Sequence, residues 1–191
     1  MKNGFVNKSA KKLALVAVFV SLMIVGAFIS IPFVPVAFTM QTLFVLMAGA
    51  VLGGAEGAIC VLIYIFMGLI GLPVFAGGGS GFGYVLKPTF GFMIGFVLAA
   101  FAVGLIVKKD PEVSSGRLIS ALFVGTLLIY ACGILYYTLI QTLYFSKGVD
   151  VWSVLLYFWI IFIPSDALKG VAVFFAVKKV LPIIHRNQLT L

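Results

Sequence analysis

The sequence has 191 residues, of which 63% are hydrophobic and 9% are charged, and its mean hydropathy is +1.27. Soluble domains carry a nearly even mixture of apolar and polar residues. The five acidic residues in the whole chain are too few to solvate a globular exterior. The composition therefore excludes a water-soluble protein and predicts one integral membrane domain over residues 1–191.

Apolar runs of about 20 residues are long enough to cross a bilayer as helices. The chain contains six candidates, at about 13–31, 41–54, 57–72, 89–107, 118–145 and 152–180. The second is short and the last two are long. The sequence therefore predicts an all-α integral membrane protein with six transmembrane helices and both termini on the same side.

The formal net charge of +8 reflects topology better than nucleic-acid binding, because the basic residues lie in short stretches between apolar runs and form no aromatic-interleaved face. Ten of the thirteen basic residues fall on the side of the termini under this topology: Lys2, Lys8, Lys11, Lys12, Lys108, Lys109, Arg117, Lys178, Lys179 and Arg186. The positive-inside rule makes that side cytoplasmic. We therefore expect a multi-pass protein of the plasma membrane that binds no nucleic acid.

The first external connection, IPFVPVAFTMQT from Ile31 to Thr42, is unusually apolar for a segment in water. We expect it to fold inward over the helices and to offer Thr39 and Gln41 as its polar contacts. Gln41 also lies about 18 Å above Gly53 along the second helix, at about 1.5 Å per residue.

The second external connection, within FAGGGSGFGYVLKPTFGF from Phe75 to Phe92, has five glycines among seven residues and ends in Lys87 and Pro88. Glycines allow bare backbone groups to approach a small molecule and to adopt positive φ. No GxGxxG, P-loop or GxSxG motif is present. Either the segment is a simple connection, or it is a lid whose Lys87 contacts an anion.

The outer half of the fifth span carries Tyr137, Gln141 and Tyr144 at helical spacing. Polar side chains on one face at this depth could line a binding site. An interfacial aromatic belt would produce the same pattern.

The last span contains IPSDALKGVAVFF, in which Asp166 and Lys169 lie three residues apart on one helical face. Asp166 lies about 18 Å into the bilayer, counted from Lys178 at about 1.5 Å per residue. An ionisable group at this depth is costly and faces a protein interior or a cavity. The pair is either a structural ion pair that neutralises itself or part of a ligand site.

The motifs Thr39-Met40-Gln41, GLPVFAGGGSGFGYVLKPTFGF from Gly71 to Phe92, and PSDALKG from Pro164 to Gly170 resemble those of the substrate-binding S components of energy-coupling factor (ECF) vitamin transporters. The resemblance is to the biotin-specific BioY family. It implies a six-helix S-component fold with biotin held near the outer surface, beneath the two external connections. It also implies a transmembrane coupling subunit and two cytosolic ATPase subunits as partners.

Members of that family dock on the coupling subunit through small residues of the first helix. The matching positions here are Ala10, Ala14, Ala17 and Ser21, where Ser21 departs from alanine. Small side chains allow close helix approach. Packing of the same stripe inside this chain is the alternative.

The residues themselves indicate a small, partly apolar ligand with an anionic group and a hydrogen-bonding head. Asp166 can accept hydrogen bonds from paired N–H groups such as those of a ureido ring, and either Lys87 or Lys169 can meet a carboxylate. Phe75, Tyr84 and the backbone of Gly77, Gly78 and Gly79 are expected walls.

A second reading is a stand-alone proton-coupled secondary transporter of a small organic anion, with Asp166 as the titrating group. Such transporters contain internal repeats, and we find none here. An enzyme would need a nucleophile with a base or a metal cluster, and the single histidine, His185, lies in the basic tail. We therefore expect no enzymatic activity, no cofactor and no metal, and any ATP hydrolysis would occur on other subunits because the chain has no Walker motif.

Overall fold

The structure is a computed structural model that describes residues 3–31, 37–146, 148 and 150–186. Six α-helices dominate these residues: α1 (Asn3–Phe28), α2 (Gln41–Leu52), α3 (Gly54–Leu69), α4 (Phe90–Val107), α5 (Ser115–Leu139) and α6 (Val151–Arg186). Two short strands, β1 (Ser30–Ile31) and β2 (Phe38–Thr39), pair antiparallel between α1 and α2. The glycine-rich connection, which we call the glycine loop (residues 75–88), contains two short 3₁₀ segments, Ala76–Gly78 and Phe82–Leu86.

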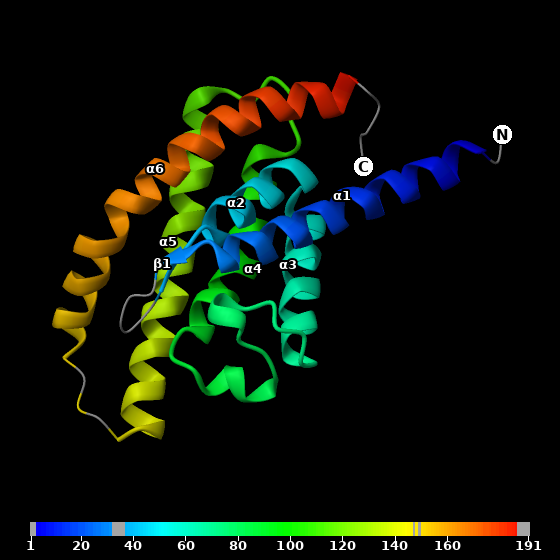
Figure 1. Ribbon diagram of the computed structural model, residues 1–191. Coiled ribbons are helices and arrows are strands. Elements are labelled where there is room, and N and C mark those ends of the chain that lie inside the picture. The colour runs from blue at the N-terminus through cyan, green and yellow to red at the C-terminus, as the bar shows by residue number, and fades with distance from the viewer. Residues whose placement is uncertain (1–2, 32–36, 147, 149, 187–191) are drawn as a thin grey trace.

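The N-terminal end of α1 and the C-terminal end of α6 lie at the same end of the molecule, and the glycine loop lies at the opposite end (Figure 1). The helix α4 occupies the centre, where it packs against α2, α3 and α5. The helix α1 covers α2 and α3, and α6 runs along α2 and α5. The long α6 contains Pro164 and Pro182, each of which removes a backbone hydrogen bond from the helix.

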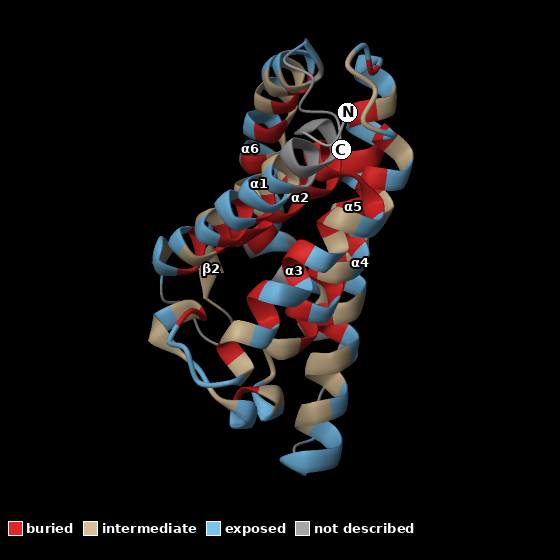
Figure 2. Ribbon diagram, turned by 90° about the vertical axis from the view of Figure 1, so that its right-hand side faces the viewer, coloured by how far each residue is buried: buried red, intermediate tan, exposed pale blue. Residues whose placement is uncertain are grey.

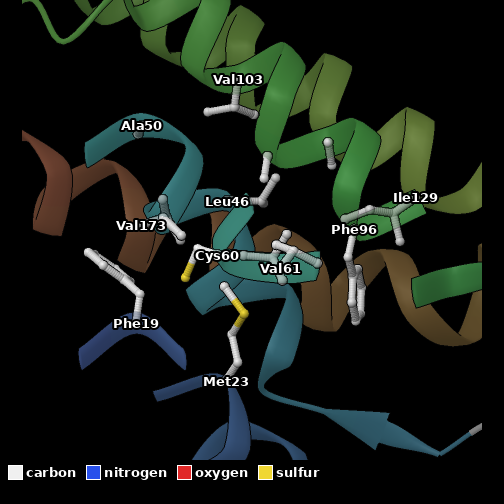
Figure 3. Close-up of a cluster of buried hydrophobic side chains, with 14 of the residues drawn as sticks. Phe19, Met23, Leu46, Ala50, Cys60, Val61, Phe96, Val103, Ile129 and Val173 are labelled. Atoms are coloured by element: carbon white, nitrogen blue, oxygen red, sulfur yellow. The ribbon is translucent and has the colours of Figure 1, made fainter. Parts of the chain in front are cut away.

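Every helix contributes to one apolar core (Figure 3). Its buried side chains include Phe19 of α1, Leu46 of α2, Val61 of α3, Phe96 of α4, Ile129 of α5 and Val173 of α6. Burial is concentrated where the helices cross, and the far end of α5 is exposed (Figure 2). The pattern fits a bundle whose outer faces contact lipid.

Glycines inside the bundle allow the central helices to touch backbone to backbone. A Cβ atom at Gly49 of α2 would collide with the backbone of Ala100 in α4, and one at Gly104 of α4 would collide with Gly53 and Gly54. Close approach of this kind is how helices associate in membranes, where van der Waals packing replaces the hydrophobic effect.

The helix ends differ from those expected. The first helix begins at Asn3 rather than near residue 13 and ends at Phe28, because Ser30 and Ile31 form β1. The third begins at Gly54, since Gly53 with φ +91° makes the whole turn after α2. The sixth continues to Arg186. Hydropathy marks only the apolar part of a helix, whereas backbone hydrogen bonding also continues through charged residues.

The fifth helix begins earlier than residue 118, because the Ser114 side chain accepts a hydrogen bond from the Arg117 amide and caps it. It passes into a π-helical turn, Ile140–Tyr144, at its other end.

Three helical segments among the described residues are long and apolar enough to cross a membrane: Ala10–Phe28, Phe90–Val107 and Ser115–Tyr144. The apolar helices α2 and α3 are shorter, at 12 and 16 residues. At about 1.5 Å per residue they span about 18 and 24 Å, less than a full hydrocarbon core of about 30 Å. The number of crossings therefore stays a prediction.

Candidate ligand pocket

A cavity of about 310 Å³ lies between the β1–β2 pair, the glycine loop and helices α2, α4, α5 and α6. Its volume is at the lower end of the range for small-molecule sites. The lining comprises Ser30, Ala37, Thr39, Gln41, Thr42, Ala76, Gly77, Tyr84, Lys87, Thr89, Phe92, Met93, Phe96, Ile129, Tyr130, Phe162, Asp166 and Lys169. Most of this surface is aromatic or aliphatic, with a few polar groups at defined places.

Seven of the residues expected from the sequence line this one cavity: Thr39, Gln41, Gly77, Tyr84, Lys87, Asp166 and Lys169. They come from three segments that are far apart in the sequence. The fold therefore brings the α1–α2 connection, the glycine loop and the charged pair of α6 to the same place.

Five expected residues are absent from the lining: Phe75, Gly78, Gly79, Tyr137 and Gln141. Phe75 is fully buried in the core, where its ring lies 4.5 Å from that of Tyr84. A Cβ atom at Gly79 would collide with the Tyr84 ring. Phe75 and Gly79 thus pack against Tyr84, which lines the pocket, without lining it themselves.

Tyr137 and Gln141 hydrogen-bond to each other, with Gln141 Nε2 donating to the Tyr137 hydroxyl at 3.2 Å. Tyr144, the third member of the stripe, is 58% exposed and packs edge-on against Phe145. An exposed tyrosine at the end of a membrane helix is typical of an interfacial aromatic belt.

One wall of the pocket contains a buried ion pair. Lys169 Nζ donates to Asp166 Oδ1 at 2.7 Å, and the two side chains are only 7% and 8% exposed. The Tyr130 hydroxyl of α5 donates to the other carboxylate oxygen. The pair therefore neutralises itself and also faces the cavity, and its part in ligand binding stays a prediction.

The glycine loop contributes a second cation to the lining. Lys87 Nζ lies 4.5 Å from the centre of the Tyr84 ring, a cation–π arrangement. Burial raises the pKa of Tyr84, so its hydroxyl stays protonated. In the part of the chain that the structure describes, no acidic side chain pairs with Lys87. Two lysines and one aspartate in the lining leave one formal positive charge.

Sequence reasoning missed several lining residues. Tyr130 could have been sought as the donor that a buried carboxylate requires. Thr89 lies in the quoted glycine-rich stretch, and its side chain interacts with that of Tyr84, another lining residue. Phe162 stacks on Phe38 with ring centres 4.2 Å apart, which joins β2 to α6. No local pattern indicated that contact.

No cluster of three or more His, Cys, Asp or Glu side chains that could hold a metal occurs among the residues that the structure describes. Cys60 is buried and Cys132 is half-buried, and both are free.

The small-residue stripe of α1 lies on the outside of the bundle. Ala10, Ala14, Ala17 and Ser21 are all exposed. The Ser21 hydroxyl donates to the Ala17 carbonyl at 2.9 Å, so its polar group is satisfied within the helix. The stripe therefore does not pack inside the bundle, and α1 contacts the core through Val16, Phe19, Val20 and Met23 instead.

Comparison with known proteins gives a consistent result. The model of the BioY family matches residues 1–186. A probable biotin transporter BioY of Lysinibacillus sphaericus is 45% identical over 130 residues, 68% of this chain and 66% of that protein, just under two thirds of its length. The biotin transporter BioY of Rhizobium etli is 35% identical over 173 residues, covering 85% and 89% of the two chains.

A solved structure has the same fold. The crystal structure of the S-component for biotin from an ECF-type ABC transporter superposes with a TM-score of 0.79 at 28% identity, covering 94% of each chain. The resemblance inferred from the motifs is confirmed, and the all-helical bundle is the S-component fold. On the match of the family model across nearly the whole sequence, this chain belongs to the BioY family.

Proposed function

We propose that this chain is the high-affinity biotin-binding S component of an ECF-type, ATP-driven vitamin importer, and that biotin occupies the pocket described above. The observation that carries the proposal is the junction of the glycine loop, β2 and the Asp166–Lys169 pair around one cavity. Relatives that carry the name biotin transporter support the choice of ligand.

The chemistry of the two walls supports one orientation of biotin over the reverse. Asp166 accepts hydrogen bonds from the ureido N–H groups, because each carboxylate oxygen keeps lone-pair capacity beyond its bond to Lys169 or Tyr130. Lys169 is already neutralised, so Lys87 is the cation for the biotin carboxylate. The aromatic side chains of Phe92, Phe96 and Phe162 enclose the apolar middle of the ligand.

The remaining parts of the proposal concern the membrane and the partners. The chain is a single membrane domain that crosses the plasma membrane six times, with both termini in the cytoplasm. Ala10, Ala14, Ala17 and Ser21 dock on the transmembrane coupling subunit, and two cytosolic ATPase subunits hydrolyse ATP. The chain itself is not an enzyme and uses no cofactor.

Asp166→Asn tests the ligand site. The substitution removes the charge that strengthens the ureido hydrogen bonds, so biotin affinity should fall by about 10- to 100-fold, or about 1.4 to 2.7 kcal/mol. Titration calorimetry on detergent-purified protein measures it, with size-exclusion chromatography as the folding control. Unchanged affinity in a folded variant would mean that the Asp166–Lys169 pair has only a structural role.

Ala14→Trp tests the docking surface. A tryptophan at the centre of the exposed stripe should abolish co-purification with the coupling subunit, since small residues are needed for close helix approach. Biotin binding should be intact, because the stripe lies outside the pocket. Val18→Trp, at an exposed position beside the stripe, is the matched control and should retain the partner.

The alternative, a stand-alone proton-coupled transporter, is separated by reconstitution. Vesicles that contain this chain alone should not accumulate labelled biotin when a proton gradient is imposed. Accumulation that stops in Asp166→Asn would support the alternative instead.

A further inference from the structure

A chain of hydrogen bonds leads from β2 through the pocket wall to the start of the glycine loop. The Thr39 hydroxyl donates to Gln41 Oε1 at 3.1 Å, and Gln41 Nε2 donates to the Tyr64 hydroxyl at 2.7 Å. The Tyr64 hydroxyl in turn donates to the Val74 carbonyl at 3.1 Å. All three bonds run in the same direction, an arrangement in which each bond polarises the next.

The middle of this chain is sealed from solvent. Tyr64 is fully buried, and Gln41 and Val74 are 4% and 8% exposed. Because Tyr64 also lies outside the cavity lining, water cannot replace a bond lost at its hydroxyl, and a buried donor or acceptor without a partner is costly. Each group needs its neighbour in the position that the structure shows.

Tyr64 also supports the glycine loop through its ring. Its ring packs edge-on against Phe75 at 5.7 Å, and Phe75 packs against Tyr84, which also contacts Lys87. The Gly81 amide donates to the Gly68 carbonyl at 2.8 Å, which ties the middle of the loop to α3. The glycine loop is thus held against α3 by packing and by a backbone hydrogen bond.

A second tyrosine holds the other end of the loop in a similar way. The Tyr136 hydroxyl of α5 donates to the Val85 carbonyl. Tyr136 is not part of the pocket lining, and among the described residues its hydroxyl bonds to the glycine loop and not to β2. The molecule therefore contains two tyrosine anchors of the same chemistry, of which one is connected to a pocket residue.

We propose that Tyr64 is a positioning residue that couples the two connections over the pocket, so that β2 and the glycine loop are ordered together. This inference rests on the proposed function, because it names what positions the biotin site. Tyr64 does not line the cavity. It acts through Gln41, which does, and which still has an amide N–H and an oxygen lone pair for a ligand beyond these bonds.

The coupling allows a ligand to order both β2 and the glycine loop. A ligand that bonds to Gln41 restricts the amide, which through Tyr64 restricts Val74 and the loop behind it. Binding then selects the arrangement in which β2 and the glycine loop are both ordered. The affinity for the ligand depends on how well these two segments are ordered before it binds.

The test compares Tyr64→Phe with Tyr136→Phe in protein without ligand. Spin labels are placed at Ile31 in β1 or at Ser80 in the glycine loop, both exposed. The background is Cys132→Ala, and the remaining Cys60 is fully buried. We expect Tyr64→Phe to increase mobility at both labels and Tyr136→Phe to leave Ile31 unchanged. If Tyr64→Phe changes Ile31 no more than Tyr136→Phe does, the coupling is absent.

Biotin kinetics provide the second readout. Tyr64→Phe should speed biotin dissociation by roughly tenfold, the scale of one lost hydrogen bond that stays buried, and change the association rate less. Dissociation at the wild-type rate would overturn the positioning role. Failure of the wild type to bind biotin would refute the proposed function, whereas the labels without ligand would still test the coupling.

Thr39→Val keeps the test decisive if Tyr64→Phe does not fold. It breaks the same chain at its first donor, at a half-buried position. The coupling predicts increased mobility of the label at Ser80, although Thr39 lies in a different connection. No change at Ser80 would overturn the proposal.

Discussion

The two walls of the pocket carry their charges in opposite ways. On α6, Asp166 and Lys169 are almost fully buried and pair with each other and with Tyr130. In the glycine loop, Lys87 is exposed and rests on an aromatic ring. The α6 wall resembles a protein core in which the two charges neutralise each other. The loop wall resembles a protein surface, where the charge of Lys87 is not neutralised by an acidic side chain of the described residues.

This difference assigns the roles of the two lysines. A buried charge persists only with a partner, because desolvation must be offset. An exposed charge keeps its hydration and can exchange water for a ligand at little cost. We therefore expect Lys169 to hold Asp166 in place and Lys87 to be the lysine that meets an anion.

The largest effect on stability should come from Lys169→Met, with Lys87→Met as the comparison. Lys169→Met leaves Asp166 as a buried charge without its ion-pair partner, which should lower the free energy of unfolding by about 3 to 5 kcal/mol. Lys87→Met loses only a cation–π contact, worth about 0.5 to 1 kcal/mol at exposed sites. Thermal unfolding in detergent measures both. Equal losses would mean that the two walls do not differ in this way.

A medium effect is expected where the loop sits on α3. A Cβ atom at Gly68 would collide with the Phe75 ring, so Gly68→Ala should cost about 1 to 3 kcal/mol through overpacking. The matched control is Gly83→Ala in the same loop, where a Cβ meets nothing within 4 Å. It should change stability by less than about 0.5 kcal/mol. Equal effects in unfolding experiments would argue that the loop is not seated on Gly68.

The smallest effect concerns the positive charge of Lys87. Lys87→Ala should weaken biotin binding by about 1 kcal/mol and leave binding of the neutral biotin amide unchanged, because only the acid needs a cation. Added salt should reduce the difference between acid and amide in the wild type, since an exposed charge is screened. Competition binding with both ligands measures this. If Lys87→Ala prefers biotin over the amide as strongly as the wild type does, the contact with the carboxylate would have to be made by Lys169 instead.

Several features could be read from the sequence because they depend on local composition. The excess of apolar residues requires a membrane protein, and Asp166 within an apolar run requires a protein environment with a partner. The glycine-rich stretch with Lys87 at its end was recognisable for the same reason. These residues violate the local pattern, which is why the sequence alone indicated them as candidates for a site.

Contacts between distant segments could not be read in this way. The pairing of Tyr130 with Asp166 joins residues 36 positions apart, and the Gln41–Tyr64 bond joins residues 23 positions apart. Each tyrosine looks like any other aromatic residue in an apolar helix. Phe75 was expected in the pocket wall and lies in the core, because the turn after α3 directs it onto Gly68.

The sequence by itself determined that the protein is a membrane protein, that it has a BioY-type loop and that a charged pair lies within its last helix. Tertiary structure alone decided which wall each residue occupies, where the helices end and which hydroxyl satisfies which buried group. The physical reason is that composition and periodicity report the solvent around a segment, whereas a buried hydrogen bond depends on the crossing of helices that are distant in the chain.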